Sequence, residues 1–167
     1  MKVTYKMIVI TGLLFLGTGC SGNGSMPITR GGGDVRDIPP SDVSASTLDL
    51  SGSGLESIPS YVFDGTGLRE LDLSDNELTG ALPAEIRHLR HLRVLDVSGN
   101  AMTGVPAEVG QLSSLEELDL SDNELTGLPL ELGNLNNLRL LDLRGNNVSQ
   151  QDLGVIRAGL SGTQILE

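Results

Sequence analysis

One apolar pattern recurs through most of the chain and constrains the fold more than any other feature of the sequence. In the segment Leu115–Leu125, leucines and one asparagine follow the spacing L-x-x-L-x-L-x-x-N-x-L. Further copies of this frame begin at Ala45, Leu68, Leu92 and Leu138, so the pattern returns every 23 or 24 residues. A fixed period of this length predicts a solenoid, in which each repeat buries its apolar face against its neighbours.

Within one repeat, two different arrangements of apolar residues are expected. Leu118 and Leu120 alternate with polar residues, which indicates a short strand with its leucines pointing inward. The leucines that follow, from Leu125 to Leu135, line the return path, and Pro129 disfavours a regular helix before it. A single repeat cannot offset the conformational entropy of ordering its backbone, so stability has to come from stacking.

Residues 45–167 are similar to leucine-rich-repeat proteins. The second halves of the repeats, ALPAEIRHL, GVPAEVGQL and GLPLELGNL, resemble bacterial and plant-type repeats, and the extra residue Ala81 is closest to the plant style. The resemblance implies an α/β-type solenoid: a short arc with a parallel β-sheet on the concave face and an irregular or short helical convex side. Five repeats are expected, at residues 45–67, 68–91, 92–114, 115–137 and 138–148 onward.

A C-terminal cap is expected at residues 149–167. Ser149 is suited to be the N-cap of a helix with Asp152 three positions later, and Leu153, Ile156 and Leu160 recur at helical spacing. A last strand follows up to Leu166. By resemblance to the family, this helix and strand close the end of the sheet, which protects an edge that would otherwise pair with other chains.

One asparagine follows each regular strand. The resemblance implies that these side chains hydrogen-bond the backbone of the turn and of the adjacent repeat, because an amide offers both donors and an acceptor. In the first repeat Ser53 stands in this position. The expected structural ladder consists of Asn76, Asn100, Asn123 and Asn146.

The outward positions of the strands form columns of surface residues on the predicted concave face. One column contains Asp49, Asp72, Asp96, Asp119 and Asp142, and its neighbour contains Thr47, Glu70, Val94, Glu117 and Leu140. Three interpretations of the aspartates remain open: local hydrogen bonding, contact with a basic protein partner, and a divalent-cation site. Adjacent strands lie about 4.8 Å apart, so mutual repulsion is expected to raise some of these pKa values, with Arg69, Arg93 and Arg139 offsetting part of the repulsion.

The first 19 residues have the composition of a secretory signal. Lys2 and Lys6 precede a short apolar run, and small residues lead to Cys20. The segment LGTGC resembles a bacterial lipoprotein box, although Gly17 stands where the family prefers leucine. The resemblance implies a lipid on Cys20, a flexible tether over residues 20–44 and, because Ser21 follows, an outer-membrane location in a Gram-negative host. An ordinary secreted protein and an uncleaved membrane-tethered form are the alternatives.

Composition argues against several classes of function. The formal net charge is −11, and nucleic acid is therefore an improbable partner because binding it requires a basic surface. Cys20 is the only thiol, so no intramolecular disulfide can form. His88 and His91 stand among arginines and indicate a solvated basic patch. No catalytic residue, metal site or cofactor is expected.

The sequence thus predicts a non-enzymatic protein–protein interaction module displayed on the bacterial cell envelope by a lipid anchor. Its partner is expected to present a basic surface to the concave face. The alternative is a structural envelope lipoprotein that associates with itself and has no discrete ligand. The sequence does not predict the oligomeric state.

Overall fold

The structure is a computed structural model in which residues 46–167 are described. The predicted signal segment, Cys20 and the tether lie outside the described residues.

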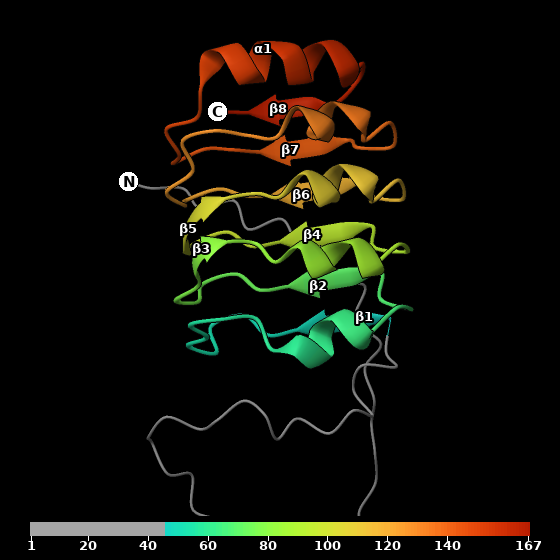
Figure 1. The fold of residues 1–167 in the computed structure, drawn as a ribbon, viewed down its shortest axis with the longest axis vertical. Helices are drawn as coiled ribbons and strands as arrows, with labels where there is room; N and C mark the ends of the chain where they lie inside the picture. Colours follow the sequence, from blue (N-terminus) through green and yellow to red (C-terminus); the bar gives the residue numbers. More distant parts are fainter. Residues whose placement is uncertain (1–45) are drawn as a thin grey trace, which may run out of the picture. The chain divides into compact units, whose positions relative to one another are not determined.

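The main element is a six-stranded parallel sheet in which each of the five repeats contributes one strand and the C-terminal cap contributes the sixth (Figure 1). Neighbouring strands pair in line, so that Leu95 lies beside Leu118 and Leu118 beside Leu141. The predicted register is therefore confirmed. In sheet order the strands are β1 (Thr47–Asp49), β2 (Glu70–Asp72), β4 (Val94–Asp96), β6 (Glu117–Asp119), β7 (Leu140–Asp142) and β8 (Gln164–Leu166).

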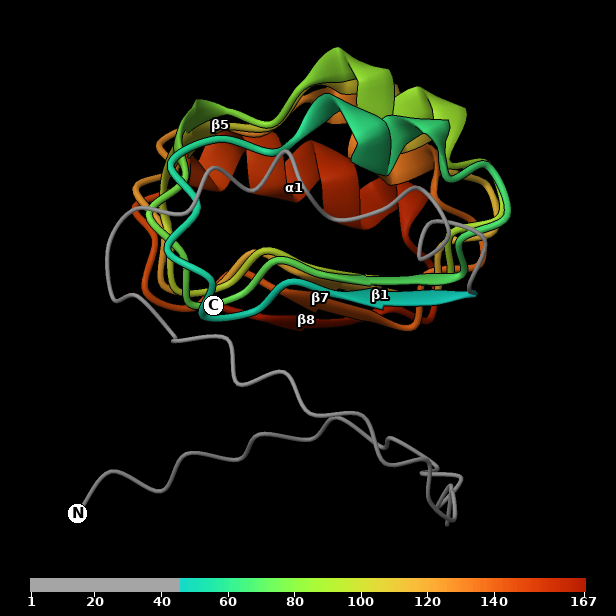
Figure 2. The same ribbon diagram turned by 90° about the horizontal axis from the view of Figure 1, so that it is seen from below.

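Short 3-10 helices form the opposite side of the stack, across the core from the sheet (Figure 2). Each helix directly follows a proline, whose fixed φ suits a helix start and whose missing N–H needs no partner there. As expected from the position of Pro129, its repeat contains no helix before this proline. The four helices are η3 (Ser60–Asp64), η4 (Ala84–His88), η5 (Ala107–Gln111) and η6 (Leu130–Asn134).

A continuous column of leucines fills the space between the sheet and the 3-10 helices. Leu118 and Leu120 are each 1% exposed and point inward from β6. Leu125, Leu132 and Leu135 are buried as well and complete the same layer from the return path. Because each layer packs against the next, removing one leucine disturbs two neighbouring repeats.

A second sheet that the sequence did not predict lies where the chain leaves the turn. Strands β3 (Thr79–Ala81) and β5 (Ala101–Gly104) pair in parallel. Their register shifts between Gly80 and Ala81, and Gly80 has a positive φ of 74°. The shift leaves Thr103 of β5 without a partner in β3, and Leu82, which follows Ala81, is buried.

The turn after the strand of each repeat contains a residue with a left-handed backbone at the same position. This residue is alternately glycine and aspartate along the stack. Asp75 and Asp122 adopt φ values of 55° and 51°, and glycine fills the neighbouring positions. A Cβ atom on Gly99 would lie 2.7 Å from Oδ1 of Asp75, and one on Gly145 would overlap the Asp122 side chain. Each aspartate therefore occupies space that its glycine neighbour leaves open. The column reads Gly52, Asp75, Gly99, Asp122, Gly145.

The expected cap is present at the C-terminal end. Helix α1 (Gln150–Gly159) begins at Ser149, whose hydroxyl accepts a hydrogen bond from the Asp152 amide at 3.4 Å. Leu153 and Ile156 are buried against the last repeat, and β8 continues the sheet beside β7. The helix approaches η6 so closely that a Cβ atom on Gly159 would overlap the carbonyl oxygen of Gly133.

Within residues 46–167 no helix has the length and apolar character needed to cross a membrane.

Candidate binding surface

The asparagine ladder has the structural role that the sequence predicts. The Asn123 side chain donates to the carbonyl oxygens of Val97, Leu120 and Ser121 at 2.9, 3.2 and 3.1 Å, and it accepts from the Met102 amide at 3.0 Å. Its partners therefore belong both to its own turn and to the preceding repeat. The same arrangement is repeated at Asn76, Asn100 and Asn146.

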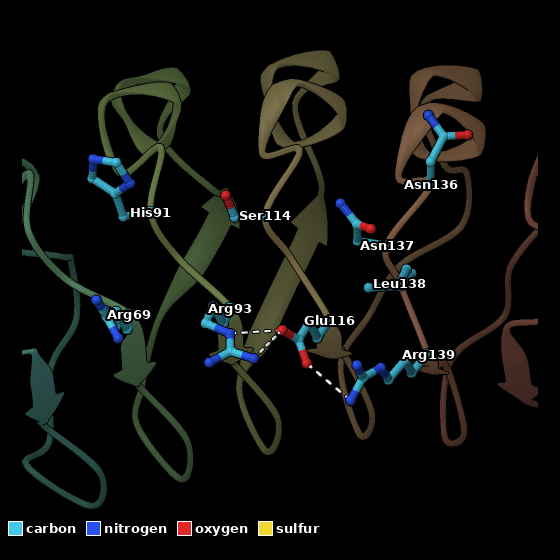
Figure 3. A pocket seen from close by; sticks show the side chains of 9 residues that line it. All are labelled: Arg69, His91, Arg93, Ser114, Glu116, Asn136, Asn137, Leu138 and Arg139. Atoms are coloured by element: carbon cyan, nitrogen blue, oxygen red, sulfur yellow. Dashed lines mark hydrogen bonds and ion pairs between the residues drawn. The ribbon is translucent and has the colours of Figure 1, made fainter.

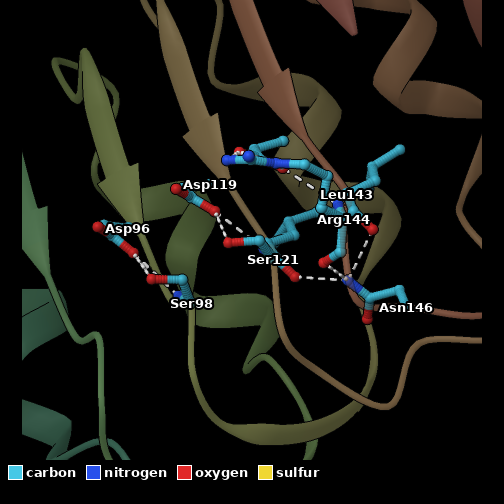
Figure 4. Close-up of polar contacts among 9 residues, drawn as sticks. Asp96, Ser98, Asp119, Ser121, Leu143, Arg144 and Asn146 are labelled. Atoms are coloured by element: carbon cyan, nitrogen blue, oxygen red, sulfur yellow. Dashed lines mark hydrogen bonds and ion pairs between the residues drawn. The ribbon is translucent and has the colours of Figure 1, made fainter. Parts of the chain in front are cut away.

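Local hydrogen bonds occupy one oxygen of most aspartates in the strand column. Oδ1 of Asp119 accepts from the Ser121 amide at 2.9 Å and from the Ser121 hydroxyl at 2.6 Å, and Asp96 makes the same pair of bonds with Ser98 (Figure 4). This geometry favours the local hydrogen-bonding interpretation, because these aspartates fix the turn that follows each strand. The equivalent pairs are Asp49 with Ser51 and Asp72 with Ser74.

The pKa values of Asp96 and Asp119 are raised, which is the expected direction, but the main cause is burial and not repulsion between aspartates. Partial burial disfavours the charged form most strongly, and the hydrogen bonds from Ser98 and Ser121 oppose this effect. Repulsion from neighbouring aspartates also raises both pKa values, but it contributes less. The only arginine that lowers the pKa of Asp119 is Arg144, so the expectation that Arg69, Arg93 and Arg139 serve this purpose is wrong.

Asp142 does not belong to the accessible surface that the sequence predicted. It is 2% exposed, and Arg144 replaces the serine found two positions later in the other repeats. Nε of Arg144 lies 2.9 and 3.0 Å from the two Asp142 carboxylate oxygens, and the Arg144 amide donates to Oδ1 at 3.1 Å (Figure 4). An arginine that folds back over the carboxylate thus closes the aspartate column at the last repeat.

The accessible part of the main sheet carries two glutamates and two apolar residues in one row. Glu70 and Glu117 are exposed, and Val94 and Leu140 are half-buried. These side chains lie beside one another on paired strands and contribute little to the leucine core. We call this row the sheet face: Glu70, Val94, Glu117 and Leu140.

A second group of acidic residues borders the sheet where the strands end. All four side chains are exposed, and they stand one and three positions after Ser74 and Ser121. We call this group the acidic edge: Asp75, Glu77, Asp122 and Glu124. The sequence analysis missed it, although its regular spacing in the second and fourth repeats was a visible signal.

The opposite border of the sheet, where the strands begin, is basic and contains a groove. Glu116 is 19% exposed and pairs with Arg93 and Arg139 from the two flanking repeats (Figure 3). Nε of Arg93 donates to Oε1 at 2.6 Å, and Nη1 of Arg139 lies 3.1 Å from Oε2. The groove has a volume of about 640 Å³. It is lined by Arg69, His91, Arg93, Ser114, Glu116, Asn136, Asn137, Leu138 and Arg139.

The two histidines lie at the surface. His88 and His91 are exposed together with Arg87 and Arg90, as expected for a solvated basic patch. Among residues 46–167 no group of three or more histidine, cysteine, aspartate or glutamate side chains is placed to hold a metal ion.

Comparison with known families agrees with the architecture. The family described as "Leucine-rich repeat region" matches residues 61–154, which is more than half of the chain. The chain belongs to the leucine-rich-repeat family.

Relatives of this leucine-rich-repeat chain include plant and bacterial proteins. Receptor-like protein 41 of Arabidopsis thaliana is 52% identical over 59 residues, which are 35% of this chain and 7% of that protein. Among solved structures, the Leptospira interrogans leucine-rich-repeat protein LIC12759 is 39% identical with a TM-score of 0.61. That match covers 65% of this chain and 28% of the Leptospira chain.

The ectodomain of a plant membrane receptor kinase, GASSHO1/SCHENGEN3 of Arabidopsis thaliana, is also similar. It is 37% identical with a TM-score of 0.65, and the match covers 77% of this chain and 16% of the receptor chain. That ectodomain was solved in complex with Casparian strip integrity factor 2. This leucine-rich-repeat chain thus spans less than a third of each of these three proteins.

Proposed function

We propose that this chain is a non-enzymatic protein–protein interaction module, displayed on the bacterial cell envelope by a lipid on Cys20. The sheet face carries this proposal, because charged and apolar side chains are presented there in fixed positions by a backbone that the leucine core and asparagine ladder hold in place. A preformed surface loses little conformational entropy on binding. The solved plant ectodomain, which was crystallised with a bound factor, supports the same kind of function.

The partner that suits this surface is basic. Glu70 and Glu117 on the sheet face and the four carboxylates of the acidic edge are exposed, so they remain available to a partner. The aspartate column contributes mainly through its charge, because Oδ1 of each strand aspartate from the first to the fourth repeat already accepts local hydrogen bonds. Binding is therefore expected to weaken as salt concentration rises.

Charge reversal on the sheet face is expected to weaken binding of a protein captured from envelope extract. The test compares Glu70→Lys/Glu117→Lys with Glu85→Lys/Glu131→Lys, which makes the same change in net charge at exposed positions of η4 and η6. Affinity for the captured protein is measured by biolayer interferometry at two salt concentrations. The sheet-face variant is expected to lose at least about tenfold in affinity, as for the loss of two or more exposed charge contacts.

Equal loss in both variants would mean that only net charge matters, and no loss in either would remove the sheet face from the proposal. Circular dichroism spectra of the variants confirm folding. Self-association is the competing function. A sedimentation coefficient that rises with protein concentration, in the absence of any captured protein, would favour it.

The lipid anchor is tested separately. Stable attachment to a membrane requires more than one acyl chain, and lipoprotein maturation supplies at least two. Mass spectrometry of the processed wild-type protein is expected to find Cys20 at the N-terminus with a diacylglycerol attached, whereas Cys20→Ser is expected to remain an unprocessed precursor. In a Gram-negative host the wild type is expected in the outer-membrane fraction. A processed wild-type protein without lipid on Cys20 would contradict the anchor but leave the binding module intact.

A further inference from the structure

The groove at the basic border of the sheet has several features that the proposed binding of a basic partner does not use. Three arginines occupy the same position in three repeats, immediately before the strands, and a groove of about 640 Å³ runs past them. The sheet is therefore bordered by basic residues where its strands begin and by the acidic edge where they end. A partner that covers the full length of the strands meets both charges.

Glu116 holds two of these arginines in an orientation that suits anion binding. Both of its carboxylate oxygens are engaged, Oε1 by Arg93 and Oε2 by Arg139 (Figure 3). A guanidinium group has five N–H donors, so each arginine keeps donors for a further acceptor. The bridge fixes the orientation of the two guanidinium groups while the group of three side chains keeps a net positive charge.

The third arginine adds charge that is not neutralised within the structure described. Arg69 is exposed, lines the same groove and forms no ion pair with any of residues 46–167. The Arg93 and Arg139 side chains are 50% and 76% exposed, so all three arginines are accessible to a partner. His91 and Asn136 line the groove as well and offer further polar groups.

We propose that this groove binds a short acidic segment of a protein partner, with carboxylates placed between Arg69, Arg93 and Arg139. Carboxylates match the planar donor geometry of arginine. A long polyanion is disfavoured because the chain carries a net charge of −11 and the acidic edge borders the same sheet. This inference rests on the proposed protein-binding function and assigns it a second contact with the opposite charge.

The test uses a fluorescein-labelled hexaglutamate peptide and the full-length protein, with affinity measured by fluorescence anisotropy. Arg69→Gln/Arg139→Gln is expected to lower affinity about tenfold because two exposed ion pairs are lost. The matched control Arg87→Gln/Arg90→Gln makes the same change in net charge at exposed positions outside the groove, and its affinity is expected to stay within about twofold of wild type. Arg69→Lys/Arg139→Lys is expected to fall between them because lysine keeps the charge but not the paired donors.

Several outcomes would overturn the inference. These are no binding of hexaglutamate by wild type, equal losses in the groove and control variants, or tighter binding of a sulfated hexasaccharide than of hexaglutamate in the same groove. Because the probe is synthetic, these results do not depend on whether a partner is captured from envelope extract. A failed capture with successful hexaglutamate binding would count against the envelope partner, and the reverse would count against the groove alone.

Discussion

Leu118→Ala is expected to lower the free energy of unfolding by about 2–5 kcal/mol, the range observed when a buried leucine is truncated in a packed core. Leu118 is 1% exposed and lies in the centre of the sheet, between Leu95 and Leu141 of the flanking strands. The cavity therefore opens into three repeats at once. Urea unfolding followed by circular dichroism measures the change.

Leu130→Ala is the matched control for this substitution. Leu130 begins η6 and is 51% exposed, so the same truncation there is expected to change stability by no more than about 0.5 kcal/mol. A loss at Leu118 no larger than the loss at Leu130 would contradict the assignment of the strand leucines to the core. A large loss at both positions would instead indicate that the exposed leucine is covered by something else.

Two glycine-to-alanine substitutions in α1 are expected to have opposite effects on stability. A Cβ atom on Gly159 would overlap the carbonyl oxygen of Gly133 and lie 2.9 Å from its carbonyl carbon. Backbone atoms cannot rotate away, so α1 has to move from η6, and overpacking of this kind costs about 1–3 kcal/mol. Gly154 lies in the same helix with open space around it, and alanine there is expected to stabilise by about 0.5–1 kcal/mol.

Differential scanning calorimetry of the two variants compares these effects directly. A higher melting temperature for Gly154→Ala and a lower one for Gly159→Ala would establish that close packing of the cap, and not helix propensity, limits stability at that end. If both substitutions stabilise the protein, α1 is packed less tightly than the structure has it.

Most of the architecture follows from local patterns that the sequence displays. The spacing of Leu115, Leu118 and Leu120 is repeated so regularly that the strand register could be predicted. An asparagine equivalent to Asn123 marks the turn in every regular copy. The cap was predictable as well, because Ser149 begins a helical pattern that ends the period. In each case the contacts that matter lie within one repeat or are copied identically in the next.

The features that escaped prediction depend on how side chains of different repeats meet. The second sheet pairs β3 with β5 of the following repeat, and its register shifts between Gly80 and Ala81. Asp142 loses its accessibility because Arg144 folds back over it. Arg93 points to Glu116 of the following repeat rather than to the aspartates. The pairing of Arg93 with Glu116 could have been predicted from the sequence, because both residues hold the same position in adjacent repeats.

The alternation of glycine and aspartate in the left-handed turns makes adjacent repeats unequal, so single repeats are not interchangeable. Removing residues 92–114 would place the turn of Asp75 directly against that of Asp122, where each side chain now lies beside a glycine. Removing residues 92–137 would instead set Gly145 beside Asp75 and restore the native contact. Loss of the single repeat of Gly99 therefore requires a compensating substitution, whereas loss of one aspartate-turn repeat brings two glycines together and leaves the turns compatible.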